Sequence, residues 1–431
     1  MRLLIWSKRV AECPRQIIKV GGEGGVVGEA SRFLAHFDGL ADPRQPGKIK
    51  YPLNEVLFLV LSSLLANGDG FTDAAEFGVE KLELLRLFMP YANGTPTHGQ
   101  IGNIMAALKI EHLQQCFASW MTAETGIPAC VIAIDGQESR RSFKKKTPRD
   151  AIHMVTAFAA RQRLVLAQQK VDEKSNEIVA IPKLLDLFGK NLKGSVVTID
   201  AMGCQRAIAE KIVEHEADYI LALKGNQSTL HDDVKLFVAE QQANELRGAR
   251  VTQHETVEKG HGRIERRRVT VIHDIGWIQQ RHNWPGLKSV VVVESTREIL
   301  DSAAVTMAEI TSDKKIGKTA KKVVEKARTV EKETRFYLTS LSLVAFMIGV
   351  MIRSHWSIEN SLHWVLDVVF GQDNSRIRMG NAPGNCAIMR HGACNILRSS
   401  QPRRASSRPM SIRLRRKVAA WSDNYLEQLM M

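Results

Sequence analysis

The segment RSHWSIENSLHW, residues 353–364, places one glutamate between two histidines. His355, Glu359 and His363 are each four residues apart, so in an α-helix they lie along one side. The segment could be a packed helix, a histidine–glutamate metal site, or one part of an active site completed elsewhere. His355 and His363 would be about 12 Å apart along the helix axis, which is too far for one zinc ion to bridge. The histidine–glutamate zinc site is therefore disfavoured, and the packed helix and the partial active site remain as alternatives.

Two aspartates could complete such a site. Asp135 and Asp200 each end an apolar run, CVIAIDG (130–136) and SVVTID (195–200). Neighbouring strands lie about 4.8 Å apart, so two strand ends can bring carboxylates together. Close carboxylates repel each other unless a cation neutralises them, and Mg²⁺ prefers oxygen ligands of this kind. The alternative is that these aspartates only cap the turns that follow the strands.

The elements that would position these acids begin with helices. The patterns predict helices within 52–68, 71–88 and 97–109, with Asn54 as an N-cap and the third helix opening at Thr97. We expect a small all-helical N-terminal domain, whose apolar residues form a core.

After Gly126 the hydrophobic period changes to that of strands. Runs at 151–160 and 163–171 predict a hairpin, and helices should separate the strands at 195–200 and 218–225. This order predicts an α/β fold with a mixed sheet covered by helices. A strand-rich stretch follows between 250 and 340, and helical periodicity returns from Val344.

The composition indicates which class of molecule the protein binds and in which compartment it works. The formal net charge is +14, with a sequence pI near 9.5, which favours an anionic partner such as nucleic acid. The six cysteines are dispersed without a CxxC pair, which argues against a zinc ribbon or a disulfide framework and favours a reducing cytosol. The apolar segments are shorter than the roughly 20 residues of a membrane-spanning helix.

Several blocks resemble, in the same order, the DDE transposases of bacterial insertion sequences, in the H-repeat-associated branch (ISAs-type). These blocks include AIDGQESRRSF, KSNEIVAIPKLL, VTIDAMGCQ, ADYILALKGNQ, GHGRIERRRV and RSHWSIENSLHWVLDVVFGQDNSRIR, and the resemblance extends over about residues 33–428. The chain departs from the branch at Gln137, where lysine is usual, and at Gln372, where an acid is usual.

The resemblance implies an RNase H-like catalytic core, with catalytic and metal-binding acids at Asp135, Asp200 and Glu359. It implies Mg²⁺, with Mn²⁺ as a substitute, for cutting a phosphodiester bond at a transposon end and joining the freed 3′-hydroxyl to target DNA. The expected partners are double-stranded DNA and further copies of the chain assembled on it, in the bacterial cytoplasm at the nucleoid. The alternative is a catalytically decayed remnant that only binds DNA.

Further residues are expected in DNA contacts or in the walls of the active-site pocket. They are Lys224, Asn226, Arg353, His355, Trp356, Arg376 and Arg378. The basic stretch from Arg398 to Lys417 is expected to contact the DNA backbone.

The resulting domain organisation has six parts. They are a flexible N-terminal extension (1–32), the helical domain (33–122), the first part of the RNase H-like core (126–245), a β-rich insertion (246–340), the catalytic-helix part of the core (341–398) and a basic C-terminal tail (399–431).

Overall fold

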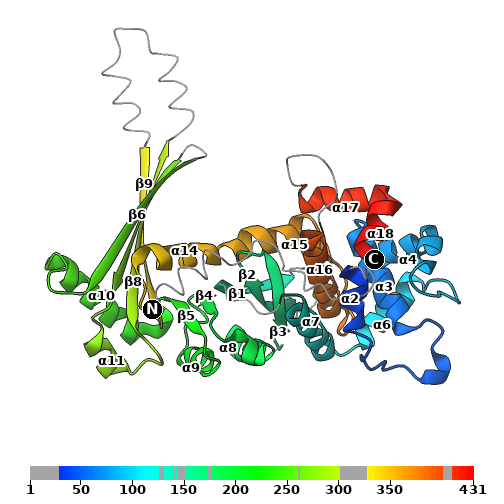
Figure 1. The fold of residues 1–431 in the computed structure, drawn as a ribbon, viewed down its shortest axis with the longest axis horizontal. Helices are drawn as coiled ribbons and strands as arrows, with labels where there is room; N and C mark the ends of the chain where they lie inside the picture. The colour runs from blue at the N-terminus through cyan, green and yellow to red at the C-terminus, as the bar shows by residue number, and fades with distance from the viewer. Residues whose placement is uncertain are drawn as a thin grey trace, which may run out of the picture. The chain divides into compact units, whose positions relative to one another are not determined.

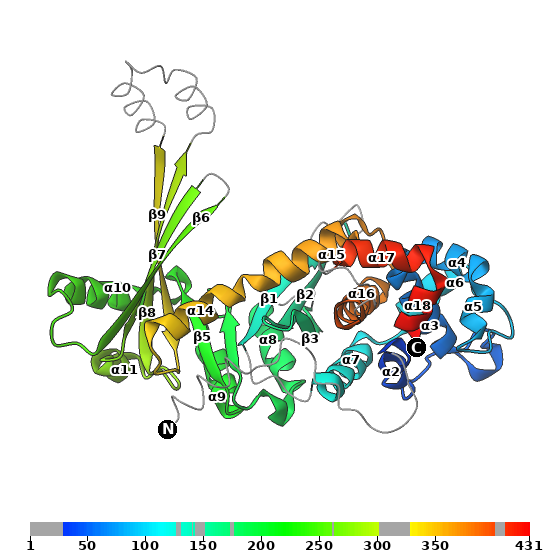
Figure 2. The ribbon, with the colours of Figure 1, turned by 45° about the horizontal axis from the view of Figure 1, so that its top comes forward.

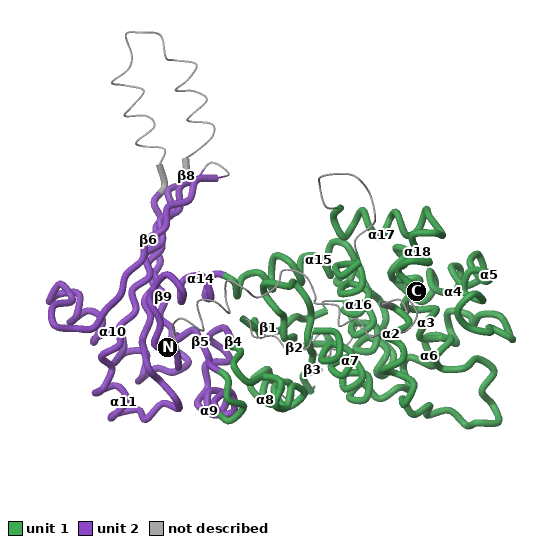
Figure 3. Tube along the Cα trace, viewed as in Figure 1, with its two compact units in different colours: residues 1–197, 214–217, 354–431 green, residues 198–213, 218–353 purple. Residues whose placement is uncertain are grey.

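The computed structural model divides the chain into two compact units, which are coloured separately in Figure 3. Unit 1 comprises residues 1–197, 214–217 and 354–431, and unit 2 comprises 198–213 and 218–353. The structure describes residues 29–125, 131–139, 141–142, 151–172, 176–260, 263–300, 328–400 and 410–431. The start of the expected N-terminal extension and residues 401–409 of the expected tail lie outside this range.

Unit 1 begins with helices, as the sequence predicts (Figure 1). They are α2 (Glu29–Ala35), η1 (Pro46–Lys48), α3 (Leu53–Leu65), α4 (Phe71–Glu80), α5 (Leu82–Arg86), α6 (His98–Ala107) and α7 (Ile110–Thr125). Thr97 is the N-cap of α6, and its hydroxyl accepts the Gln100 N–H. The prediction for Asn54 is wrong: α3 starts one residue earlier, after Pro52, and the Asn54 amide donates to Asp38 instead.

Three antiparallel strands of unit 1 follow these helices. They are β1 (Val131–Ser139), β2 (Ile152–Ala159) and β3 (Leu164–Lys170), and the hairpin of β2 and β3 is confirmed. Helix α8 (Glu177–Asp186), η3 (Gly189–Leu192) and strand β4 (Val196–Ile199) complete this stretch. The strand order is β3-β2-β1-β4.

The rest of unit 1 comes from the C-terminal part of the chain. It contains η5 (Glu359–His363), α15 (Trp364–Val368), η6 (Gln372–Asn374), α16 (Ala382–Ser399), α17 (Ile412–Trp421) and α18 (Asp423–Met430). Helix α16 is buried along nearly its whole length and packs against α3, α6, α7 and β3 (Figures 1 and 2). The Asn395 amide on α16 exchanges two hydrogen bonds with the backbone of Val165 on β3. It thereby satisfies peptide groups of an edge strand that would otherwise stay unpaired.

Unit 2 continues the sheet from β4, whose last two residues, Thr198 and Ile199, belong to it. Its strand order is β4-β5-β9-β8-β7-β6, and the strands from β9 to β6 pair antiparallel. The elements are α9 (Arg206–Glu214), β5 (Asp218–Leu223), η4 (Gly225–Gln227), α10 (Ser228–Ala243), β6 (Val251–Gly260), β7 (Arg263–Ile272), α11 (Gly276–His282), β8 (Ser289–Leu300), β9 (Arg328–Thr339) and most of α14 (Ala345–His355). Strands β4 and β5 are neighbours joined through α9, which is the connection that parallel strands require. The predicted mixed sheet flanked by helices is therefore confirmed.

Within the described residues, no helix combines the length and the apolar character that a membrane crossing requires.

Candidate active site

Asp135 lies in the middle of β1, not at its end. The buried residues Ile132, Ala133 and Ile134 precede it, and β1 stays paired with β2 as far as Ser139. The expectation that Asp135 ends its strand is therefore wrong, because β2 is long enough to pair with the residues that follow. The Asp135 carboxylate is one-fifth exposed, and its Oδ1 accepts the N–H of Gly136 at 2.9 Å. It thus lies at the surface of the sheet, where a ligand can reach it.

Glu359 begins a π-helical turn, η5. The Trp364 N–H donates to the Glu359 carbonyl, five residues back instead of four. The wider turn changes the helical phase, so the equal spacing of His355, Glu359 and His363 does not align their side chains as in a regular α-helix. Glu359 is exposed, His363 is largely buried, and Leu362 is fully buried. Single-turn π-bulges occur frequently at functional sites.

Three side-chain contacts join β1 to the segment that begins with Glu359. His363 Nδ1 lies 3.6 Å from Asp135 Oδ2, and Gln137 Nε2 donates to Asp367 Oδ1 at 2.9 Å. Gln372 Nε2 donates to Ser139 Oγ at 3.2 Å. The two glutamines at which the chain departs from the resembled branch are therefore the residues that form these hydrogen bonds. Together the contacts hold the helix of Glu359 against the strand of Asp135 within unit 1.

His363 meets Asp135 as a neutral imidazole. Burial lowers its pKa to about 4, and the nearby His355 adds to the lowering while Glu177 opposes it. At neutral pH His363 is therefore uncharged and does not offset the negative charge of Asp135.

A second pair of side chains lies against β1 at Gly136. His153 Nε2 is 2.7 Å from Glu177 Oε1, and the Glu177 side chain is only 11% exposed. The hydrogen bond to Glu177 raises the pKa of His153 above its usual value, although burial opposes this. A Cβ atom on residue 136 would lie 2.0 Å from Glu177 Oε1 and 2.4 Å from His153 Nε2. Glycine after Asp135 is therefore required by this pair, which the sequence analysis missed; the block KSNEIVAIPKLL contains Glu177 but gave no sign of its partner.

Asp200 belongs to unit 2 and follows directly after β4, as predicted. Its Oδ1 accepts the N–H groups of Met202 at 3.0 Å and Gly203 at 3.3 Å. The Asn226 amide donates to the Ala201 carbonyl at 2.6 Å. Asn226 therefore braces the turn that carries Asp200, and the turn-capping role is present in the structure. The second carboxylate oxygen of Asp200 is not used by this cap.

The donor chemistry of the three acids suits a hard divalent cation, which prefers carboxylate oxygens. Within the described residues, neither Asp200 nor Glu359 forms an ion pair with a lysine or arginine that would compete with a cation. In the same residues, no three His, Cys, Asp or Glu side chains are gathered closely enough to be recognised as a metal site, and this includes the segment from His355 to His363.

The remaining predicted contact residues differ in their surroundings. The Arg353 guanidinium forms an ion pair with Glu258 on β6, which lowers the pKa of Glu258 and raises that of Arg353. Lys224 and Arg376 are exposed, His355 is half-buried, and Trp356 is 39% exposed. Arg378 Nε donates to the Arg141 carbonyl at 3.2 Å. Arg353 is thus engaged within the protein, whereas Lys224 and Arg376 present their charges to solvent.

The expected basic tail is in large part a folded element of unit 1. Helices α17 and α18 occupy most of residues 410–431, and Arg398, Arg415 and Arg416 are buried or nearly so. Arg416 is fully buried and donates to the carbonyls of Leu64, Gly68 and Val369 and to Asp69 Oδ1. These three arginines hold backbone carbonyls together, so the expectation that they contact DNA is wrong. Arg413 and Lys417 remain exposed on α17.

Comparison with known proteins gives two family-model matches. Residues 34–121 match a region described as DDE_Tnp_1-associated, and residues 126–396 match the Transposase DDE domain. The second match confirms the RNase H-like fold for the sheet and its helices.

Curated relatives cover nearly the whole chain. The Escherichia coli K12 protein named "H repeat-associated putative transposase YhhI" is 34% identical over 407 residues, which are 93% of this chain and 98% of that protein. The E. coli O157:H7 protein YncI is 35% identical over 401 residues, covering 92% of this chain and 94% of YncI. An uncharacterized protein of Xanthobacter autotrophicus is 44% identical over 268 residues, covering 61% and 88% of the two chains.

Proposed function

The chain belongs to the transposase family defined by the DDE domain, and from this premise we propose that it cuts phosphodiester bonds at transposon ends and joins the freed 3′-hydroxyl to target DNA. The observation that carries the proposal is the set of side-chain contacts between β1 and the Glu359 segment. A site that positions reacting groups needs its acids on elements held rigidly together. The contacts from Gln137 and Gln372 supply this for Asp135 and Glu359.

In the proposed site, Asp135, Asp200 and Glu359 hold divalent cations, Mg²⁺ or Mn²⁺ in its place. When bound, such cations activate the attacking oxygen and stabilise the leaving oxygen of an in-line displacement. The neutral His363 lies beside Asp135 without cancelling its charge. Asn226 fixes the turn of Asp200 and acts as a positioning residue.

The proposed partner is double-stranded DNA at the element's ends and at the target. The formal net charge of +14 supports binding to a polyanion. Lys224 and Arg376 are exposed cations among the residues expected to contact DNA, and Trp356 offers a partly exposed aromatic surface. We further propose that copies of the chain assemble on DNA to bring two ends together, and that they act at the bacterial nucleoid.

A strand-nicking assay tests the proposal. The substrate is linear DNA that flanks the gene and includes its terminal repeats, incubated with protein and Mg²⁺ or with EDTA. We expect Mg²⁺-dependent nicking that is lost in Asp135→Asn and Glu359→Gln while DNA binding remains. Glu111→Gln, which changes an exposed glutamate on α7, is the matched control and should nick normally. Binding without nicking by the unchanged protein would instead identify a remnant that only occupies DNA.

A further inference from the structure

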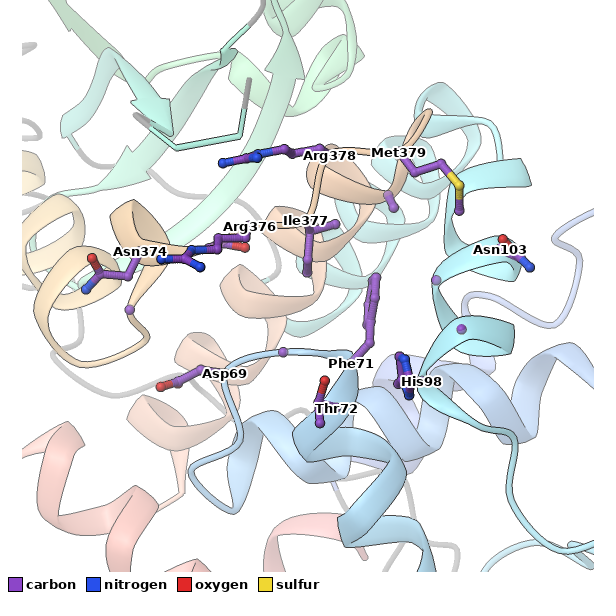
Figure 4. Close-up of a pocket in the computed structure, with 16 residues that line it drawn as sticks. Asp69, Phe71, Thr72, His98, Asn103, Asn374, Arg376, Ile377, Arg378 and Met379 are labelled. Carbon is purple, nitrogen blue, oxygen red and sulfur yellow. The ribbon is translucent and has the colours of Figure 1, made fainter. Parts of the chain in front are cut away.

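Unit 1 contains a cavity of about 630 Å³. The described residues that line it do not include Asp135, Asp200 or Glu359. One wall is formed by the starts of α4 and α6, and the other by residues 371–379, which follow α15 (Figure 4). Gln372, beside this second wall, is hydrogen-bonded to the end of β1. The cavity is large enough for a ligand the size of a nucleotide, since small-molecule sites measure about 300–1,000 Å³.

The first wall presents backbone donors. The N–H groups of Phe71 and Thr72 begin α4, and those of His98 and Gly99 begin α6. Such initial N–H groups have no partner within their own helix, and the helix dipole makes them attract anions. The caps engage other groups: Asp73 accepts from the backbone of Asp69 and Gly70, and Thr97 accepts from Gln100. Among the described residues, the N–H groups of Phe71, Thr72, His98 and Gly99 have no other acceptor, so they remain available to a ligand.

Arginines independently make the cavity cationic. Arg376 and Arg378 line it, and Arg390 lies behind it, almost fully buried. Arg390 donates through Nη2 to the Asp69 carbonyl and to Ser375 Oγ, one on each wall, and its buried Nε has no acceptor within the described residues.

The acid that lines the cavity is already neutralised. Asp69 is the one acidic residue among those described as lining it. Its Oδ1 lies 3.0 Å from the buried Arg416 Nη2. The excess of positive charge therefore remains for a ligand's phosphate.

Apolar side chains occupy the part of the cavity between these charges. Phe71 and Ile377 extend toward each other across it, and Arg376 and Arg378 run from the second wall (Figure 4). Met379 also lines this region. An aromatic ring beside phosphate-binding groups is the combination that binds a nucleotide of a single strand, by stacking and by charge.

We propose that this cavity binds one nucleotide of a DNA strand, with its phosphate at Arg376 and its base against Phe71 and Ile377. The choice of DNA as the source of the nucleotide rests on the proposed function. Within the part of the chain that the structure describes, the Arg376 side chain forms no hydrogen bond or ion pair and is exposed, so its charge is available to the phosphate.

The test uses the full-length protein in EDTA, so that no strand is cut. Fluorescence anisotropy measures binding of a short fluorescein-labelled oligothymidylate. We expect Arg376→Ala to weaken binding about tenfold, as loss of a charge-assisted hydrogen bond implies. Arg163→Ala is the matched control because it removes an exposed arginine between β2 and β3 of the same unit. It should weaken binding less than about twofold. Thermal melting checks that both variants are folded.

Photo-crosslinking with a 5-bromodeoxyuridine oligonucleotide locates the base. We expect attachment within 69–72 or 374–379, and competition by thymidine 5′-monophosphate that inorganic phosphate does not match. Equal weakening by the two arginine substitutions, or crosslinks confined to other segments, would overturn the proposal. Equal competition by inorganic phosphate would reduce the cavity to an anion site and overturn its assignment to a nucleotide. Because the strand-nicking assay is separate, failure of nicking with these binding results intact would affect only the proposed chemistry.

Discussion

Gly136→Ala should break the interaction between His153 and Glu177, whose side chains lie against β1 at residue 136. The new Cβ would lie 2.0 Å from Glu177 Oε1 and 2.4 Å from His153 Nε2, so both must move. These atoms are at the ends of side chains, so the backbone of β1 can remain in place while the ion pair breaks. Glu177 is 11% exposed, and its displaced carboxylate has little access to water.

The expected decrease in stability follows from the loss of the hydrogen bond between His153 and Glu177. A hydrogen bond to a charged group contributes about 1.5–3 kcal/mol, so we expect the free energy of unfolding to fall by about that amount. At about 2–4 °C per kcal/mol, the value for domains of 150–250 residues, the melting temperature should fall by at most about 3–12 °C. Urea unfolding followed by circular dichroism measures the first quantity, and thermal melting measures the second.

A double-mutant cycle separates the collision from a general effect of alanine in a strand. In a Glu177→Ala background the closest obstacle is gone, so Gly136→Ala should cost at least about 1 kcal/mol less than in the unchanged protein. Equal costs in both backgrounds would refute the reasoning, because the effect would then not pass through Glu177. Gly225→Ala, at a glycine whose Cβ would meet no atom within 4 Å, is the control and should cost little.

Three further predictions follow from the described contacts. Glu177→Gln should destabilise the protein more at pH 6 than at pH 9 in urea unfolding. Because the pKa of His153 is raised in the folded protein, the pair stabilises it fully below the unfolded-state pKa of about 6.5, and this stabilisation is lost as pH rises through the folded-state pKa. A destabilisation that does not change with pH would contradict this. Arg416→Leu should lower the free energy of unfolding by about 3–5 kcal/mol in the same assay, because it leaves the Asp69 carboxylate and three carbonyls without their donor. The control Arg413→Leu, at an exposed arginine, should lower it by under about 0.5 kcal/mol. Equal decreases would count against a stabilising role for the buried Arg416. Asn226→Ala should lower the nicking rate about tenfold by loosening the Asp200 turn, with Asn244→Ala on the same unit as control, and unchanged nicking would remove Asn226 from the positioning role.

Local patterns predicted the elements well. The hairpin of β2 and β3, the strand before Asp200 and the helix that opens at Thr97 follow from hydrophobic periodicity. These features depend on residues close together in sequence. The order of strands in the sheet depends on contacts between distant segments, and only the general mixed architecture could be foreseen.

The wrong expectations for Asp135 and for the C-terminal arginines share one physical origin, which is contact between distant segments. Asp135 was placed at a strand end because its own run stops being apolar there, yet β2 continues to pair with the polar residues that follow. Regular helical spacing aligned His355 with His363, whereas a π-turn begins at Glu359. The basic residues near the C-terminus looked solvated by composition, but Arg416 finds four acceptors far away in sequence.

Metal rescue tests most directly the claim that Asp135 binds a catalytic cation. Asp135→Cys replaces a hard oxygen ligand with a softer thiolate, which binds Mg²⁺ poorly and accepts Mn²⁺ more readily. In the strand-nicking assay we predict no nicking by this variant with Mg²⁺ and restored nicking with Mn²⁺, while Asp135→Ala stays inactive with both ions. Nicking by Asp135→Ala in Mg²⁺, or equal inactivity of the cysteine variant in both ions while the unchanged protein nicks in both, would contradict the account.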